Sequence, residues 1–324
     1  MAADQSWRRS GRFTDVVIFY WLLVIGCLSF FFLPSWEGLG VGLNYIVSCY
    51  FIPNAVKFNM NDYHFYLNTC GDETHPPLLF LHGFMGNGED FREAIAQLSL
   101  DFYCLTIDLP GHGKTKINGA DRCYRMENTG GAIADLLARF NISQCYLVGY
   151  SMGGRLALYL ALHFPHKFPK IILESSSPGL ETECEREMRR QKDEEFARSL
   201  ETRSLSDFLE NWYRNPLFAS LHNHPQFETI IQRRRQNDPI LLAKSLRYLG
   251  TGQQPSLWDE LKNLRNPILL LIGERDEKFR AIATRMKTLS PLIQLQSVEN
   301  CGHNIHLENP TKFIKKVKDF LNAP

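Results

Sequence analysis

The sequence predicts an α/β fold, in which a mainly parallel sheet has helices on both faces and a helical lid is inserted late in the chain. From residue 60 onward, short apolar runs alternate with segments of helical period, which is typical of a parallel sheet with crossover helices. The central runs are continuously apolar, as expected for strands that are covered on both faces. One segment, 178–250, is helical and charged and contains no candidate strand.

The apolar runs define the expected strands, which are 63–69, 77–82, 102–108, 145–149, 170–175, 268–273 and 293–298. Helical periodicity predicts helices at about 88–98, 126–140, 152–163, 278–288 and 309–321. The charged segment follows the strand at 170–175, a position that suits a lid over the carboxyl edge of the sheet. We therefore expect one α/β domain over 60–324, with its lid at about 178–250.

Length, charge and cysteine content exclude several classes of protein. The 324 residues suffice for one large α/β domain or two small domains, and 44% hydrophobic and 22% charged residues are ordinary for a globular chain. The formal net charge is +1, so no overall field predicts a nucleic-acid partner, and any charge effect must be local. The eight cysteines form no C-x-x-C pair and no Cys/His cluster with zinc spacing, which favours free thiols and predicts no metal site.

The first 59 residues allow two interpretations. Residues 16–33, VVIFYWLLVIGCLSFFFL, have no charge and are just long enough to span a bilayer. Three arginines precede this run and would keep the N-terminus in the cytoplasm. A single span would place most cysteines outside the cytoplasm, which fits poorly with free thiols. The alternative is a start at Met60, with 1–59 a leader absent from the mature protein. Membrane contact is expected only through 16–33.

A G-x-S-x-G motif at 149–153, GYSMG, provides a candidate nucleophile or base. It follows the apolar run CYLVGY and precedes the helical run MGGRLALYLALHF, which is the strand–turn–helix setting that the motif requires. We therefore predict that Ser151 is catalytic. Backbone N–H groups of Met152 and of Phe84, in the loop after the run PLLFLH, are expected to form an oxyanion hole. His82 is expected to brace that loop.

The acid and the base are expected after the serine, in the order Ser, Asp or Glu, His. Asp276 lies just past the apolar run ILLLIG, where a triad acid belongs, and Glu274 and Glu277 are the competing carboxylates. His303 follows the last expected strand and is the candidate base, whereas His306 is expected to start a helix or to pack. In such a triad the carboxylate fixes the imidazole tautomer and stabilises its charged form.

Seven motifs together resemble one family of the α/β-hydrolase superfamily, over about 63–322. They are LHGFMGNGEDF, DLPGHG, GYSMGGR, ESSSPGLETECEREMR, NWYRNPLFASL, GERDEKFR and GHNIHLENP. The family is 2-succinyl-6-hydroxy-2,4-cyclohexadiene-1-carboxylate synthase, of menaquinone and phylloquinone biosynthesis. The resemblance implies a lyase on a hydrolase fold that needs no metal or cofactor. It eliminates pyruvate from 2-succinyl-5-enolpyruvyl-6-hydroxy-3-cyclohexene-1-carboxylate. The family's triad falls on Ser151, Asp276 and His303.

The resemblance also implies a set of substrate-binding side chains. They are Tyr150, Arg155, Arg189, Trp212 and one of Arg233 and Arg234, between which the alignment is ambiguous by one residue. The family's substrate has several carboxylates, which guanidinium groups bind through two-point, charge-assisted hydrogen bonds. From the residues alone Arg155 is favoured, because the turn at the serine directs the start of its helix toward the site. The eight acids and six bases of 181–203 would equally suit a solvated helix with salt bridges.

Two other functions are hypotheses that the residues leave open. The same triad would serve an ordinary serine esterase or a C–C bond hydrolase, although the basic residues and the lid motif favour the synthase. A membrane-tethered binding protein with an inactive site is the third hypothesis, and the complete triad argues against it. The expected partner is a small polycarboxylate. The expected location is the cytoplasm, or the plastid stroma in a eukaryote.

Overall fold

The computed structural model describes residues 56–60 and 62–323. Its strands are β1 Val56–Met60, β2 Tyr63–Cys70, β3 Pro77–Leu81, β4 Tyr103–Ile107, β5 Lys116–Ile117, β6 Tyr146–Tyr150, β7 Ile171–Glu174, β8 Ile268–Gly273 and β9 Ile293–Val298. They form one sheet in the order β1-β2-β4-β3-β6-β7-β8-β9, with β5 paired to β2. Neighbours from β4 to β9 are parallel, whereas β2 is antiparallel to β1, β4 and β5. The predicted mainly parallel sheet is confirmed.

The seven expected strands are all present, and the sequence missed β1 and β5. β5 has two residues, which is too short for a periodic pattern. β1 lies before the domain boundary expected at 60 and pairs with β2 along its whole length, so the α/β domain begins at least as early as Val56. The rest of the expected leader or anchor, with its candidate span at 16–33, lies outside the described residues. Among the helices of the described residues, none is both long and apolar enough to cross a membrane.

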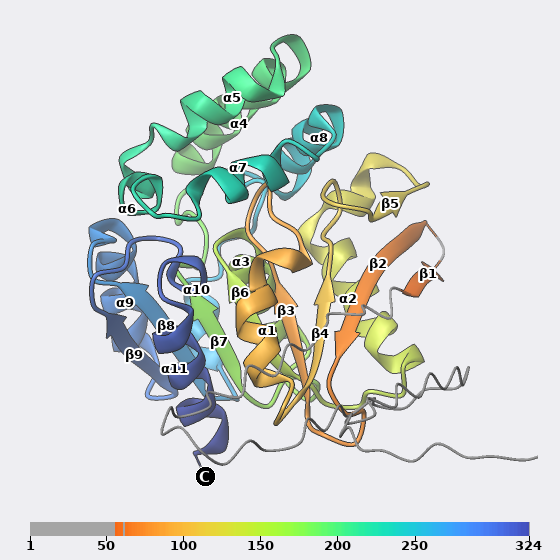
Figure 1. Ribbon diagram of the computed structural model, residues 1–324, viewed down its shortest axis with the longest axis vertical. Helices are drawn as coiled ribbons and strands as arrows, with labels where there is room; N and C mark the ends of the chain where they lie inside the picture. The colour runs from red at the N-terminus through yellow and green to blue at the C-terminus, as the bar shows by residue number, and fades with distance from the viewer. Residues whose placement is uncertain (1–55, 61, 324) are drawn as a thin grey trace, which may run out of the picture. The chain divides into compact units, whose positions relative to one another are not determined.

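Helices cover both faces of the sheet, as Figure 1 shows. α1 Arg92–Leu98 and α11 Pro310–Asn322 share one apolar cluster with the sheet, and α2 Met126–Arg139, α3 Met152–His163 and α9 Glu277–Leu289 share another. β3 shows how the strands serve both clusters, because Leu78 and Phe80 belong to the first and Leu79 and Leu81 to the second. The expected helices are confirmed, and the six cysteines of the described residues are free thiols.

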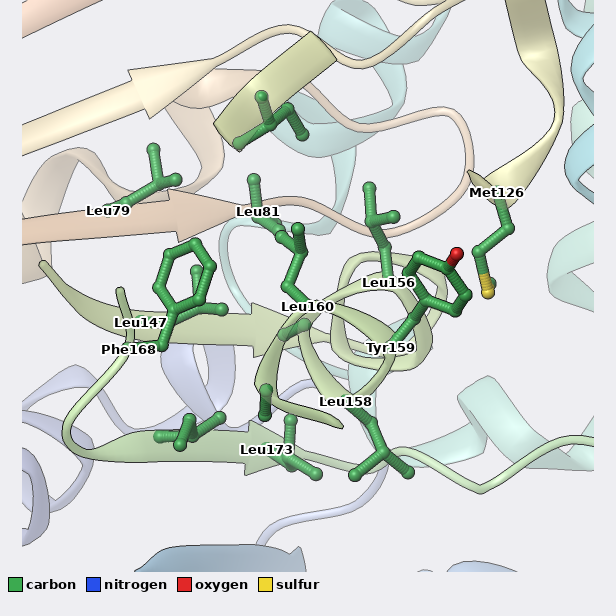
Figure 2. Close-up of a cluster of buried hydrophobic side chains, with 14 of the residues drawn as sticks. Leu79, Leu81, Met126, Leu147, Leu156, Leu158, Tyr159, Leu160, Phe168 and Leu173 are labelled. Atoms are coloured by element: carbon green, nitrogen blue, oxygen red, sulfur yellow. The ribbon is translucent and has the colours of Figure 1, made fainter. Parts of the chain in front are cut away.

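α3 is the most enclosed helix of the site, since its residues from Met152 to Ala161 are all buried. Figure 2 shows Leu156 and Leu160 of this helix among side chains of the sheet, including Leu81 and Leu147. Truncating one such leucine to alanine costs about 2–5 kcal/mol in well-packed cores. The helix that begins directly after Ser151 is therefore held firmly against the sheet.

The predicted lid is present as a set of helices beyond the sheet edge (Figure 1). They are α4 Glu183–Thr202, α5 Leu205–Tyr213, α6 Ala219–His222, α7 Phe227–Arg234 and α8 Pro239–Leu249. The lid has its own apolar core, which also includes Met85 from the loop after β3 and Leu307 from α10 Ile305–Glu308. Arg247 of α8 forms an ion pair with Glu194 of α4 at 2.7 Å. The lid is thus packed onto the loops that surround the candidate site.

Candidate active site

Ser151 lies at the sharp turn between β6 and α3. Its φ of 49° is in the left-handed region, which residues other than glycine seldom adopt. Glycines on both sides permit the turn. A Cβ on Gly153 would lie 2.1 Å from the carbonyl oxygen of Leu81, and a Cβ on Gly149 would lie 2.5 Å from that of Gly153. The strand–turn–helix setting expected for the motif is therefore present, with the serine at the carboxyl end of a central strand.

Three side chains that are far apart in the sequence meet at this turn. Ser151 Oγ lies 3.2 Å from His303 Nε2, and His303 Nδ1 lies 2.6 Å from Asp276 Oδ2. The other oxygen of Asp276 accepts the backbone N–H of Phe279 at 3.2 Å, which caps α9 and fixes the carboxylate. The imidazole and the carboxylate are both buried. In this arrangement the histidine can take a proton from the serine while the aspartate stabilises the charged ring.

The competing acids and bases lie elsewhere. Glu274 and Glu277 are exposed at the surface. His306 is fully buried beside Glu174, with 2.8 Å between its Nδ1 and Oε2 of the glutamate, so it belongs to a separate buried pair. His82 accepts a backbone N–H through Nε2 at 2.9 Å and contacts a backbone carbonyl through Nδ1, which is the bracing role expected from the sequence. Only the histidine at 303 reaches the serine among the described residues.

The two expected oxyanion donors, Phe84 and Met152, are both residues of the cavity wall. Met152 is the first residue of α3, so its backbone N–H has no acceptor within the helix. Phe84 follows β3, and both residues line the same cavity as Ser151. A negatively charged oxygen placed between them would also be stabilised by the N-terminal end of α3.

A cavity of about 550 Å³ has Ser151 and His303 in its wall together with residues of the lid. None of its lining residues, all of which belong to the described part of the chain, is aspartate or glutamate. Six of the lining side chains are cationic: Arg155, Arg189, Lys192, Arg214, Arg234 and Lys278. A hollow with charge of one sign attracts ligands of the opposite sign. The site is thus suited to an anion with several charged groups.

Three of these cations have a carboxylate partner. Arg189 Nε donates to Asp193 at 2.7 Å, which leaves its two terminal nitrogens without a recorded partner. Arg214 forms an exposed pair with Glu210. Arg234 donates from both terminal nitrogens to Asp90, at 2.9 and 2.8 Å.

The two adjacent arginines that the alignment left ambiguous take different positions. Burial alone would lower the pKa of Arg234, but the charge of Asp90 raises it above its ordinary value. Arg233 donates to the backbone carbonyl of Glu89 at 3.0 Å and is not among the residues that line the cavity. Of this pair, the structure therefore brings Arg234 to the candidate site.

Arg155 is buried and forms no ion pair with a carboxylate of the described residues. Its Nη1 donates to the side-chain oxygen of Gln254 at 2.8 Å, and both terminal nitrogens lie 3.3 Å from the carbonyl oxygen of Leu249. Burial, together with the nearby charge of Arg189, lowers its pKa to about 10, so the guanidinium is still charged at neutral pH. A buried cation that only neutral groups contact is an effective ligand for an anion.

The two expected aromatic residues also line the cavity. The ring centroid of Tyr150 lies 5.4 Å from that of His303, and the ring centroid of Trp212 lies 5.2 Å from that of Phe84. They give the site an apolar wall next to its charged groups. In the described residues, no group of three or more His, Cys, Asp or Glu side chains is arranged to hold a metal ion.

Sequence reasoning missed three of the cations, Lys192, Arg214 and Lys278. Lys192 lies on α4 and Arg214 directly follows α5, in a part of the lid whose charge pattern also suits a solvated surface. Lys278 had a signal that could have been used. It lies two residues after Asp276, in the first turn of a helix, where the helix dipole disfavours a positive charge.

Comparisons with known proteins agree with this geometry. A model of the α/β-hydrolase fold family matches residues 76–310. The chain is 36% identical over 255 residues to the 2-succinyl-6-hydroxy-2,4-cyclohexadiene-1-carboxylate synthase of Citrobacter koseri, covering 78% of this chain and 96% of that protein. The chain belongs to this synthase family.

Other relatives are consistent with membership of the synthase family. A solved structure of MenH from S. aureus is 36% identical, with a TM-score of 0.75, and the match covers 81% of this chain and 98% of that one. The protein PHYLLO, chloroplastic, of Arabidopsis thaliana is 36% identical over 258 residues, but the chain spans only 15% of its length. An esterase from Thermogutta terrifontis, 22% identical with a TM-score of 0.69, shares the fold alone. The family inferred from the motifs is confirmed, and the chain is an enzyme on an α/β-hydrolase scaffold.

Proposed function

We propose that the chain eliminates pyruvate from 2-succinyl-5-enolpyruvyl-6-hydroxy-3-cyclohexene-1-carboxylate to give 2-succinyl-6-hydroxy-2,4-cyclohexadiene-1-carboxylate. The observation that supports this most is the cavity beside Ser151, whose wall has six cationic side chains and no acidic one. The substrate's succinyl, ring and enolpyruvyl carboxylates complement such a cavity, whereas a neutral ester does not. The relatives named as this synthase support the same reaction.

The first step is removal of the proton on ring carbon 2, which the adjacent succinyl ketone makes acidic. Ser151 acts as the base, and its own proton passes to His303 Nε2, which lies 3.2 Å from Oγ. Asp276 holds the imidazole in the required tautomer and stabilises its positive charge. Negative charge develops on the ketone oxygen, where the backbone N–H groups of Phe84 and Met152 stabilise it.

The second step is loss of the leaving group. The electron pair of the broken C–H bond forms a double bond between ring carbons 2 and 3, and the double bond between carbons 3 and 4 moves to carbons 4 and 5. The C–O bond at carbon 5 breaks, and the enolpyruvyl group leaves as enolpyruvate. This product takes up the proton that the ring lost, by way of the His303–Ser151 pair, and becomes pyruvate. The reaction needs no acyl-enzyme, metal or cofactor.

The arginines take different parts in binding. Arg155 and Arg189 bind substrate carboxylates directly, because the first has no anionic partner and the second has free terminal nitrogens. Arg234 supplies positive charge from a fixed position, since both its terminal nitrogens are bound to Asp90. We propose no substrate contact for Arg233. Tyr150 and Trp212 of the cavity wall pack against the ring of the substrate.

The test is to incubate the purified protein with the enolpyruvyl cyclohexene substrate and to measure diene absorbance and released pyruvate together. We expect equal amounts of the two products, and turnover by Ser151→Ala that is slower by at least about a hundredfold. A panel of neutral p-nitrophenyl esters is the comparison. Fast ester hydrolysis without pyruvate release would instead identify a serine esterase of the same fold.

The proposed reaction belongs to menaquinone or phylloquinone biosynthesis. We propose a location in the cytoplasm, or in the plastid stroma of a eukaryote, and the name of the chloroplastic relative supports the second case. Fractionation of the source cells, followed by detection of the chain with an antibody, tests the location.

A further inference from the structure

Lys278 is a cation of the cavity wall that no carboxylate of the described residues pairs with. Its Nζ contacts an aromatic ring, 5.6 Å from the ring centroid of Phe279. The carboxylate that acts on its charge is Asp276, whose two oxygens bind His303 and the backbone N–H of Phe279. The ammonium therefore keeps its hydrogen-bonding capacity for another partner.

The position of Lys278 is unfavourable for a positive charge in the ligand-free protein. It lies in the first turn of α9, where the helix dipole repels cations. Arg189 and Lys192 line the same cavity and add further repulsion. Although the residue as a whole is exposed, its pKa is lowered, first by burial of the ammonium and then by the charge of Arg189. A bound anion would remove this penalty.

Lys278 is linked to the triad through the ring of Phe279. The ring of Phe279, which the ammonium contacts, has its centroid 4.6 Å from that of His303. Three cavity cations, Arg155, Lys192 and Lys278, have no carboxylate partner among the described residues, and the proposed substrate has three carboxylates. Since Arg155 and Arg189 are proposed to bind two of these carboxylates, one carboxylate remains for a further cation of the cavity wall.

We propose that Lys278 is a specificity-determining residue that binds one carboxylate of the polycarboxylate substrate at the side of the cavity next to His303. The proposal rests on the proposed function, because it requires an anionic substrate in this cavity. Binding places an anion between the ammonium and the start of α9, and it offsets the repulsion from Arg189. Lys278 acts in binding and in the choice of a charged substrate, and it takes no part in proton transfer.

The experiment compares Lys278→Gln with Lys287→Gln. The control removes the same charge from the same helix at a residue that is also exposed, but Lys287 does not line the cavity. For Lys278→Gln we expect KM to rise roughly three- to tenfold. This range lies between the effect of losing an exposed ion pair and that of losing a buried charge-assisted hydrogen bond. We expect kcat to change less than about twofold. KM of the control should equal that of the wild type. Lys278→Arg should recover most of the lost affinity.

Two further measurements separate binding from a structural role. The KM of the wild type should rise more steeply with salt than that of Lys278→Gln, because one screened contact has been removed. The ligand-free variant should be at least as heat-stable as the wild type, since a repelled cation is gone. Equal KM values for the two glutamine variants, or a lower melting temperature for ligand-free Lys278→Gln, would overturn this proposal alone. A wild-type protein that released no pyruvate would overturn the proposed function as well.

Discussion

Arg155→Lys separates the proposed synthase from an esterase by changing the geometry of a buried cation while keeping its charge. In the structure the guanidinium reaches Gln254 at 2.8 Å and the carbonyl of Leu249 at 3.3 Å, and no described carboxylate pairs with it. Lysine is a point charge and loses the planar two-point fork. Burial also lowers the pKa of a lysine, which reduces its charged fraction.

The expected loss follows from the contacts. One charge-assisted hydrogen bond to a substrate carboxylate is worth about 1.5–3 kcal/mol, which corresponds to roughly ten- to a hundredfold in kcat/KM. Losing the hydrogen bonds to Gln254 and Leu249 should also lower the free energy of unfolding by about 1–3 kcal/mol. Activity is therefore measured well below the melting temperature, with circular dichroism to confirm that the variant is folded.

The assay measures kcat/KM of the wild type and of Arg155→Lys on the enolpyruvyl substrate and on a neutral p-nitrophenyl ester. Arg265→Lys, at an exposed position outside the cavity, is the matched control and should behave as the wild type. We expect Arg155→Lys to lose activity on the charged substrate selectively. An equal loss on both substrates, or none on either, would refute the inference that Arg155 binds a carboxylate.

Three other changes test the site and the lid. Ser151→Ala and His303→Ala should each lower kcat by at least about a hundredfold with the fold retained, because both belong to one proton-transfer unit; near-normal turnover by either would exclude the triad as base. Gly153→Ala should reduce both the melting temperature and kcat, since its methyl group would lie 2.1 Å from a strand carbonyl oxygen, and an unchanged variant would show that the turn relaxes freely. Arg247 lowers the pKa of Glu194 to about 2. The ion pair between them therefore stabilises the lid fully above the ordinary glutamate pKa, and this stabilisation is lost as the pH falls toward 2. Hydrogen exchange of the lid should rise over that acid range, and Arg247→Gln should show a smaller rise; an equal rise would contradict the assignment.

The strands and helices of the α/β domain could be predicted because strands that are buried on both faces are continuous apolar runs, separated by segments of helical period. β3 and β8 are continuous runs of apolar residues, which is the pattern typical of a strand covered on both faces. β5 could not be predicted, since two residues cannot show a period, and its pairing with β2 depends on contacts distant in the sequence. β1 was missed because its alternation of apolar and polar residues lasts only five residues and lies before the boundary expected at 60.

The triad was predictable for a different reason, which is that each member follows the end of a strand in a fixed order. The positions of the cavity's cationic residues follow no comparable rule of order or place in the sequence. Arg233 and Arg234 are adjacent on α7 and project about 100° apart, so an error of one position in the alignment exchanges a cavity residue for one bound to a backbone carbonyl. Lys192 was hidden in a helix with many charges of both signs, where only the folded lid shows which face turns inward.

In the proposed function, the charge of the cavity directs a triad that a hydrolase could also use toward an anionic substrate. A serine, a histidine and two backbone N–H groups stabilise an oxyanion whether it arises by attack on an ester or by removal of a proton beside a ketone. The outcome then depends on which substrate is held with its acidic C–H at the serine. Arg155 of α3 and Lys278 of α9 both line the cavity, and neither has an anionic partner of its own among the described residues. A polycarboxylate that satisfies both is fixed in orientation as well as bound, and the same elements that could cleave an ester are then directed to an elimination.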